Sequence, residues 1–139
     1  MTVKTNNQFG EELILHTANY VNHHGQHSTH HHHDHIGLLN TVQDCATTCE
    51  HMTSMLHHSH DLHSRGVQLS HLRDCADICA LMVDYLARSS HFTKSLASFC
   101  AYVCEICGNT CLQFPDQESQ RCGHICLGCA KECKEFAGY

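Results

Sequence analysis

The stretch CAYVCEICGNTC, Cys100 to Cys111, places four cysteines at intervals of four, three and four residues. A second stretch, CGHICLGCAKEC from Cys122 to Cys133, repeats the same intervals. At about 100° per residue, these offsets fall within an arc of roughly 60° around a helix, so the four side chains of each stretch share one face. The spacing therefore predicts two helices that each carry a stripe of thiols.

Two segments before Cys100 follow the same rhythm with fewer cysteines. Their stripe positions are Cys45, Cys49, Met52 and Leu56 in the first segment and Cys75, Cys79, Met82 and Leu86 in the second. The two methionines stand where the later stretches have their third cysteine. A thioether at such a position either fills the core or serves as a further soft ligand, and the sequence leaves both interpretations open.

Four helices are predicted, joined by short connections. They are expected over residues 36–58, 67–88, 91–113 and 118–136. Ser90 is expected to cap the third helix and Pro115 to end it. Because helices of similar length joined by short loops pack as antiparallel neighbours, we predict an all-α fold, an antiparallel up-down-up-down four-helix bundle over residues 36–139.

A His-rich N-terminal tail is predicted over residues 1–35, before the bundle. It ends in HHGQHSTHHHHDH, His23 to His35, and Phe9, Leu13, Thr17 and Tyr20 have the spacing of a short helix. Neutral imidazoles bind metal ions such as Cu(II), Ni(II) and Zn(II). The tail is therefore either a metal-capturing segment or one without a metal role.

Composition and charge narrow the class of protein. The chain has 139 residues, one proline and a net charge of −6 with histidine counted neutral. It has no basic block of the kind that binds nucleic acid, and no apolar stretch of the length of a signal peptide or a membrane span. We therefore expect a cytoplasmic protein whose partners are neither nucleic acid nor membrane.

The expected compartment bears on the role of the twelve cysteines. Cytosolic thiols are kept reduced. Residues four apart on a helix also hold their Cβ atoms about 5–6 Å apart, whereas a disulfide needs about 3.5–4.5 Å. Pairs within one stripe are thus better placed to hold a metal ion between two sulfurs than to form disulfides.

Cu(I), zinc and iron–sulfur clusters are the centres that thiolate-rich sites select. Zinc usually takes four ligands from converging turns. CAYVCEIC and CGHICLGC match the CxxxCxxC signature of radical SAM enzymes, but that signature works on a loop wrapped around one cluster, so we interpret the match as coincidence. Cu(I) accepts two or three thiolates and suits a line of thiols. A multi-zinc thiolate protein and an iron–sulfur electron-transfer protein remain the alternatives.

The sequence also resembles a known family. DCADICALMVDYLARSSHFTKSLASFCAYVCEICGNTCLQF followed by RCGHICLGCAKECKEF is similar to the cysteine-rich four-helix-bundle copper storage proteins of bacteria, over about residues 38–137. The resemblance implies a bundle that binds many Cu(I) ions through core thiolates, for storage or detoxification, in a cytosolic homotetramer. Met52 and Met82 depart from this pattern, because relatives often carry cysteine there.

The candidate metal ligands are the twelve cysteines of the stripes. They are Cys45, Cys49, Cys75, Cys79, Cys100, Cys104, Cys107, Cys111, Cys122, Cys126, Cys129 and Cys133. No catalytic triad, phosphate-binding loop or carboxylate pair is recognisable, so we expect no enzyme. Copper ions are the expected ligand, and a copper chaperone or acceptor is the candidate protein partner.

The antiparallel topology predicts that the two ends of the bundle differ. One end is expected to be a mouth through which copper passes, with His71 on the stripe of the second helix. Further ligands predicted for this mouth are Met52, Met55, His60, His71 and Met82. The opposite end is expected to be an apolar plug made of Leu38, Val42, Leu86, Phe92, Leu96 and Phe136.

Overall fold

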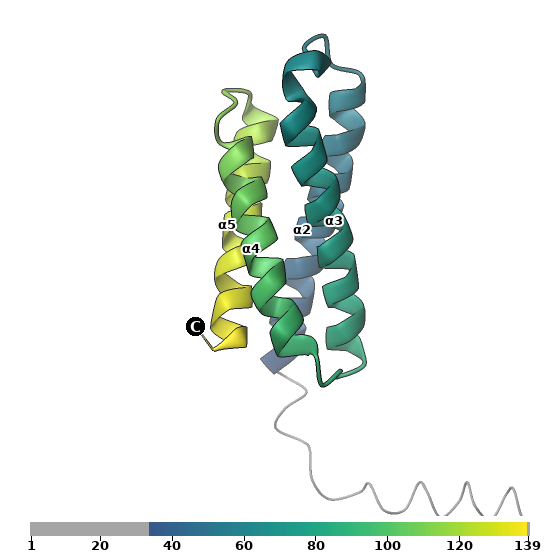
Figure 1. Cartoon of the computed structure of the whole chain (residues 1–139), viewed down its shortest axis with the longest axis vertical. Coiled ribbons are helices and arrows are strands. Elements are labelled where there is room, and N and C mark those ends of the chain that lie inside the picture. The colour runs from purple at the N-terminus through teal and green to yellow at the C-terminus, as the bar shows by residue number, and fades with distance from the viewer. Residues whose placement is uncertain (1–33, 139) are drawn as a thin grey trace, which may run out of the picture. The chain divides into compact units, whose positions relative to one another are not determined.

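A computed structural model of the chain describes residues 34–138 (Figure 1). Its elements are α2 (Asp34–His57), the 3-10 helix η1 (Leu62–Arg65), α3 (Gly66–Ala87), α4 (Thr93–Cys111) and α5 (Gln117–Ala137). Along the chain the α-helices run alternately up and down, and α2 and α4 each pack between α3 and α5. The predicted all-α four-helix bundle is confirmed, whereas the predicted tail lies outside the described residues, apart from its last two positions.

The start of α4 differs from the prediction. The helix begins at Thr93, and Ser90 is not its N-cap. Instead, the Ser90 hydroxyl accepts a hydrogen bond from the Phe92 backbone N–H at 3.3 Å, and the Ser90 carbonyl accepts one from Thr93. Ser89 adopts a left-handed conformation with φ of 51°. Ser90 is thus used by the tight turn between α3 and α4 rather than by the helix.

The start of α5 shows a side-chain cap. Asp116 has extended backbone angles, and its carboxylate accepts a hydrogen bond from the Ser119 backbone N–H at 2.9 Å. This contact satisfies one of the free N–H groups of the first helical turn. At the other end of α5, Gly138 adopts the left-handed conformation with φ of 94° that commonly ends a helix.

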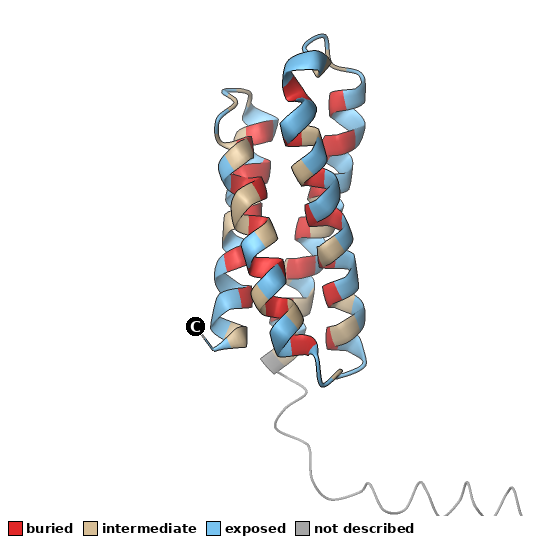
Figure 2. Cartoon of the chain, viewed as in Figure 1, coloured by how far each residue is buried: buried red, intermediate tan, exposed pale blue. Residues whose placement is uncertain are grey.

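The four helices bury residues at alternating intervals of four and three, the register of helices packed side by side in a bundle (Figure 2). The buried positions in this register are Leu38, Val42, Cys45, Cys49, Met52 and Leu56 on α2; Gln68, Leu72, Cys75, Cys79, Met82 and Leu86 on α3; Thr93, Ala97, Cys100, Cys104, Cys107 and Cys111 on α4; and Ser119, Cys122, Cys126, Cys129 and Cys133 on α5. Because neighbouring helices are antiparallel, these positions meet as layers across the bundle.

Candidate metal centre

Two adjacent layers in the middle of the bundle consist of cysteine alone. We call them the thiol layers; they contain Cys49, Cys75, Cys104 and Cys126, and Cys45, Cys79, Cys100 and Cys129. The other four cysteines lie above and below these layers. All twelve are free and buried. The stripes that the sequence predicted on separate helices therefore face one another in one core.

Within the thiol layers, Cys104 on α4 is a hub. Its sulfur lies 3.5 Å from that of Cys79, 3.6 Å from Cys75, 3.8 Å from Cys129 and 3.9 Å from Cys100. The first three partners belong to other helices, and only Cys100 shares the helix. Most of the close sulfur contacts of Cys104 are thus between helices. An ion held by these sulfurs would be shared by different helices and not only by cysteines of one stripe.

Cys126 on α5 has the corresponding role toward α2. Its sulfur lies 3.6 Å from Cys49, 3.8 Å from Cys45 and 3.9 Å from Cys107. Cys45 also lies 3.9 Å from Cys75, which joins the two hubs into one continuous array. A bound ion could therefore share sulfurs with the next ion along the core.

Two groups of four sulfurs are close enough to surround a single ion. Cys45, Cys49, Cys75 and Cys126 form one group, and Cys45, Cys75, Cys79 and Cys104 form the other. In each group all four sulfurs lie within 4.8 Å of one another. Cys45 and Cys75 belong to both, so the two groups form a shared site rather than two closed four-ligand sites.

The environment of the hubs favours the protonated thiol. Hydrogen bonding with Cys100 and the other surrounding sulfurs, together with burial, raises the pKa of the Cys104 thiol well above its usual range. Hydrogen bonding with Cys107 and burial do the same for the pKa of Cys126. Several thiolates cannot be crowded into a dry core without a cation to balance them. A soft cation that replaces these protons would remove that penalty.

Above the thiol layers, a polar cluster occupies the end of the core near η1. Gln68, which is fully buried, donates from its side-chain amide to the Ser119 hydroxyl at 2.9 Å and to the Cys111 sulfur at 3.6 Å. The Arg65 guanidinium donates to the Gln68 amide oxygen at 3.0 Å and to the Ser119 hydroxyl at 3.2 Å. Because its oxygen is taken, the amide presents hydrogen-bond donors to Cys111 rather than a ligand atom.

Arg65 ties this cluster to the loops at the same end. Its guanidinium forms ion pairs with Asp61 at 2.6 Å and Asp116 at 2.8 Å, and it stacks 4.2 Å from the centroid of the Phe114 ring. Burial acts to lower the pKa of Arg65, but the hydrogen bonds to the two carboxylates outweigh it and the pKa is raised. η1 and the start of α5 are thus joined across the end of the bundle.

The sequence placed His71 in the core at this end, and that prediction is wrong. Leu72 is fully buried at the corresponding core position. His71 is half-buried on the outside of the bundle, where its Nδ1 lies 2.9 Å from the Thr110 hydroxyl. The alternation of four and three, continued backwards from Cys75, leads to Leu72 and Gln68, so Gln68 and not His71 is the polar side chain facing the core.

The other residues predicted for the mouth are separated by the structure. Met52 is buried in the layer above the thiol layers, Met55 is partly exposed beside it, and His60 is exposed in the loop after α2. Met82 is fully buried near the far end of α3, so its predicted place at the mouth is wrong. It faces the core on the opposite side of the thiol layers from Met52.

The apolar end is confirmed for most of its predicted residues. Leu38, Val42 and Leu86 are buried, and Leu96 and Phe136 are partly buried and pack against the core. Phe92 is 69% exposed and takes no part in the plug. It precedes the first residue of α4, where the turn from α3 directs its side chain outward.

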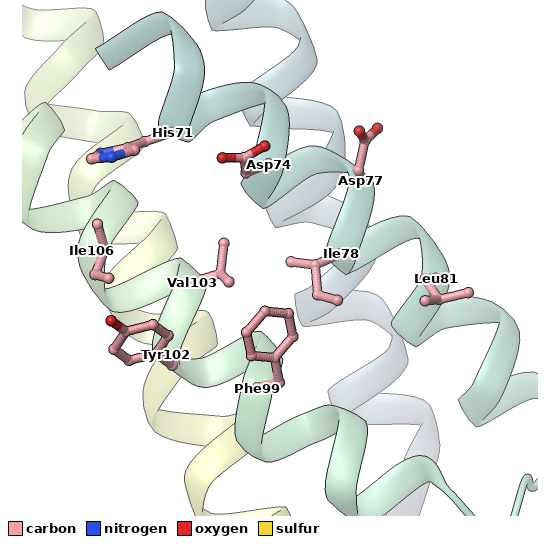
Figure 3. Close-up of a pocket in the computed structure, with 9 residues that line it drawn as sticks. All are labelled: His71, Asp74, Asp77, Ile78, Leu81, Phe99, Tyr102, Val103 and Ile106. Atoms are coloured by element: carbon pink, nitrogen blue, oxygen red, sulfur yellow. The ribbon is translucent and has the colours of Figure 1, made fainter. Parts of the chain in front are cut away.

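An apolar groove lies between α3 and α4 on the outer surface, away from the thiols (Figure 3). Its volume is about 450 Å³, and it is lined by Ile78, Leu81, Phe99, Tyr102, Val103 and Ile106, with His71, Asp74 and Asp77 beside them. The rings of Phe99 and Tyr102, each more than half exposed, stack with centroids 6.5 Å apart. No cysteine lines this groove, so it is a surface feature distinct from the core.

The family follows from a comparison with known sequences. The profile of the family described as Csp, copper storage protein, matches residues 31–138. The chain belongs to the copper storage protein family. The match covers all four helices of the bundle, and therefore all twelve core cysteines. Within residues 34–138, no helix has both the length and the hydrophobicity that crossing a membrane requires.

Relatives from Bacillus subtilis agree with this assignment. A cysteine-rich protein of strain 168, YhjQ, is 38% identical over 95 residues, which is 68% of this chain and 87% of that protein. The Cu(I)-bound structure of the copper storage protein BsCsp3 has a TM-score of 0.71 at 30% identity and covers 73% of this chain and 96% of its own. Apo-Csp3 from the same organism has a TM-score of 0.69 at 30% identity, covering 73% and 97%.

Proposed function

We propose that this protein stores Cu(I), holding several ions per chain in the thiol-lined core of the bundle. The observation that carries the proposal is the pair of thiol layers, in which eight buried cysteines from four helices form one array of close sulfur contacts. Thiolates are soft ligands that select soft ions such as Cu(I). The related BsCsp3 is described as Cu(I)-bound.

The proposed ligands are the twelve core cysteines. The shared groups around Cys45 and Cys75 favour Cu(I) over zinc, because zinc typically occupies closed sites of four ligands, whereas Cu(I) accepts sulfurs that bridge between ions. If each ion takes two thiolates and each thiolate serves two ions, the capacity is about one ion per cysteine. We expect roughly 8–14 Cu(I) ions per chain from this sharing argument.

Anaerobic titration of the reduced protein with Cu(I), against a competing chelator, tests this function. The expected result is a capacity in the predicted range with colourless protein, since Cu(I)–thiolate centres do not absorb visible light. A capacity of one or two ions would contradict storage and favour a discrete zinc site. Brown colour after purification would instead indicate an iron–sulfur protein.

The proposed storage role requires no catalytic activity. The cysteines are buried, whereas a nucleophilic cysteine needs an exposed, electropositive setting with a base beside it. We propose a non-enzymatic cytoplasmic protein that receives copper from a donor, such as a chaperone, and returns it to an acceptor. Fractionation of the native cells, with copper measured in each fraction, checks the location.

We further propose that the chain assembles as a homotetramer through the α3/α4 groove. The resemblance implies a tetramer, and Phe99 and Tyr102 expose more than half of their aromatic surface there. Sedimentation analysis of Phe99→Glu should show a smaller species than the native chain, because a charge would be buried at the interface. Phe92→Glu is the matched control, since Phe92 is exposed outside the groove. Equal assembly of both variants would contradict this surface.

A further inference from the structure

A second pocket, between α2 and α5, connects the surface with the core. Its volume is about 270 Å³, and it is lined by Thr47, Thr48, His51, Met52, Met55, Glu118, Arg121 and Cys122. The exposed fraction falls from 37% at Met55 to 3% at Met52 and 1% at Cys122. The pocket thus runs from solvent past two thioethers to a buried thiol.

The lining of this pocket suits Cu(I) in particular. Thioether, imidazole and thiolate are all donors that Cu(I) accepts, and thioether sulfur is a poor ligand for hard cations. Met55 lies four residues after His51 and three after Met52, so its side chain is a neighbour of each of them on the helix surface. Glu118 and Arg121 carry opposite charges and offset each other, which leaves the neutral soft donors to decide what binds.

At the η1 end of the bundle, polar and charged side chains stand between solvent and the thiols. There the core is occupied by Gln68 and Ser119, both fully buried, and by Arg65 with its two ion pairs. The Gln68 amide turns donors toward Cys111, and a cation approaching along the bundle axis would meet these hydrogens and the guanidinium charge. The pocket enters one layer lower, where Cys122 adjoins the thiol layer that contains Cys126.

We propose that the α2/α5 pocket is a side entrance to the store and holds a capture site for Cu(I), formed by Met55 and Met52 with His51 at its outer edge, and that Cys122 behind it is the first thiol to receive the ion. This inference rests on the proposed storage function and specifies how the ion reaches the core. The copper–thioether bonds break as a bond to the Cys122 sulfur forms. The thiol proton leaves to solvent through the pocket, and the ion remains Cu(I) throughout.

Two changes test the entrance through the rates of loading and of chelator-driven release, with Cu(I) supplied anaerobically as its acetonitrile complex. The double variant Met52→Leu/Met55→Leu removes both thioethers with little change in volume. Thr48→Phe fills the pocket and leaves every ligand in place. Each variant should slow both rates about tenfold, equivalent to about 1.4 kcal/mol in the barrier. The final number of bound Cu(I) ions should fall, in the double variant, by no more than the one ion of the capture site.

Thr41→Phe is the matched control for the blocked pocket, because Thr41 is a half-buried residue of the same helix that does not line it. Its rates should equal those of the native chain. Rates that stay native in both test variants would overturn the entrance. Since capacity is measured separately, full capacity with unchanged rates contradicts the entrance alone, whereas a native capacity of one or two ions contradicts storage and the entrance with it.

A direct view of the capture site comes from chain labelled with ¹³C at the methionine methyl groups. The site binds more weakly than the thiol layers, so it should fill last in an equilibrium titration with Cu(I). The Met52 and Met55 methyl signals should therefore move in the final additions, after the thiol layers are full. Signals from both that never move, even at full loading, would overturn the capture site.

Discussion

Gly108 on α4 lies directly against Gly123 on α5. A Cβ atom at Gly108 would come within 2.9 Å of the Gly123 carbonyl oxygen and of the Leu127 side chain, and one at Gly123 would come within 2.8 Å of Leu112 and 3.0 Å of the Gly108 carbonyl oxygen. These two glycines allow α4 and α5 to approach each other closely beside Cys107 and Cys122. The approach fixes how Cys107 and Cys126, on the same two helices, face each other at 3.9 Å.

Gly108→Ala should therefore destabilise the bundle by about 1–3 kcal/mol, the usual cost of inserting atoms into a packed contact. Gly128→Ala is the matched control on α5, because a Cβ there meets nothing within 4 Å. It should be neutral or stabilise the protein by up to about 1 kcal/mol, since alanine favours the helix. Denaturant unfolding of both copper-free variants measures the difference, and equal stabilities would contradict the close contact.

A second prediction concerns the polar cluster at the end of the bundle. Gln68→Leu keeps the volume of the side chain but removes three buried hydrogen bonds, those of Gln68 with Ser119, Cys111 and Arg65, while Arg65 keeps its contacts with Ser119 and Asp116. We expect a loss of about 1–3 kcal/mol in the free energy of unfolding. Gln113→Leu, on the exposed surface, should change it by less than about 0.5 kcal/mol. Equal effects would mean that the cluster contributes nothing to stability.

The cysteine stripes, together with the short connections between helices of similar length, predicted the bundle correctly. The cysteines are spaced by alternating intervals of four and three, which is also the spacing of core positions in packed helices. Each cysteine therefore indicated both a core position and which face of its helix is buried. The ends were harder, because loop residues have no periodicity. Ser90 has the chemistry of an N-cap, but the left-handed Ser89 before it tightened the turn, and α4 began three residues later.

The error at His71 had a different cause. Both His71 and Leu72 precede Cys75 by a helical interval, and a histidine near cysteines suggested a ligand. Counted backwards from Cys75, the strict alternation of three and four leads to Leu72 and then to Gln68. Counted backwards from Cys122 on α5, it leads to Ser119, and all three residues are buried. The contact of Arg65 with Asp116 could not be predicted, because it depends on how two segments far apart in sequence meet in space.

The unequal contacts of the cysteines lead to a third prediction. Cys104 contacts four sulfurs, whereas Cys133 lies beyond the thiol layers, in the layer next to the apolar end. Cys104→Ala should therefore remove more Cu(I) ions from the final capacity than Cys133→Ala. Copper analysis after saturation and gel filtration measures both. Equal losses would indicate ions held by single helices, without sharing between them.

The fourth prediction concerns pH. Thiols must lose their protons to bind copper, and hydrogen bonding with the neighbouring sulfurs together with burial raises the pKa of Cys104 and Cys126, so both are protonated near neutral pH in the copper-free protein. Loading should therefore release protons, which a pH indicator in weakly buffered solution can count.

Because protons compete with Cu(I) at every pH below these raised pKa values, affinity should fall as the pH falls. Each proton displaced per ion changes the binding free energy by about 1.4 kcal/mol per pH unit, or about tenfold in affinity. Competition against a chelator whose own pH dependence is known, at pH values of about 6.5, 7.5 and 8.5, gives the slope. The slope should be larger for the ions of the thiol layers than for the last ions to bind, because thioethers carry no proton to displace. An affinity independent of pH, with no proton release, would mean that the core thiols are already ionised before copper arrives.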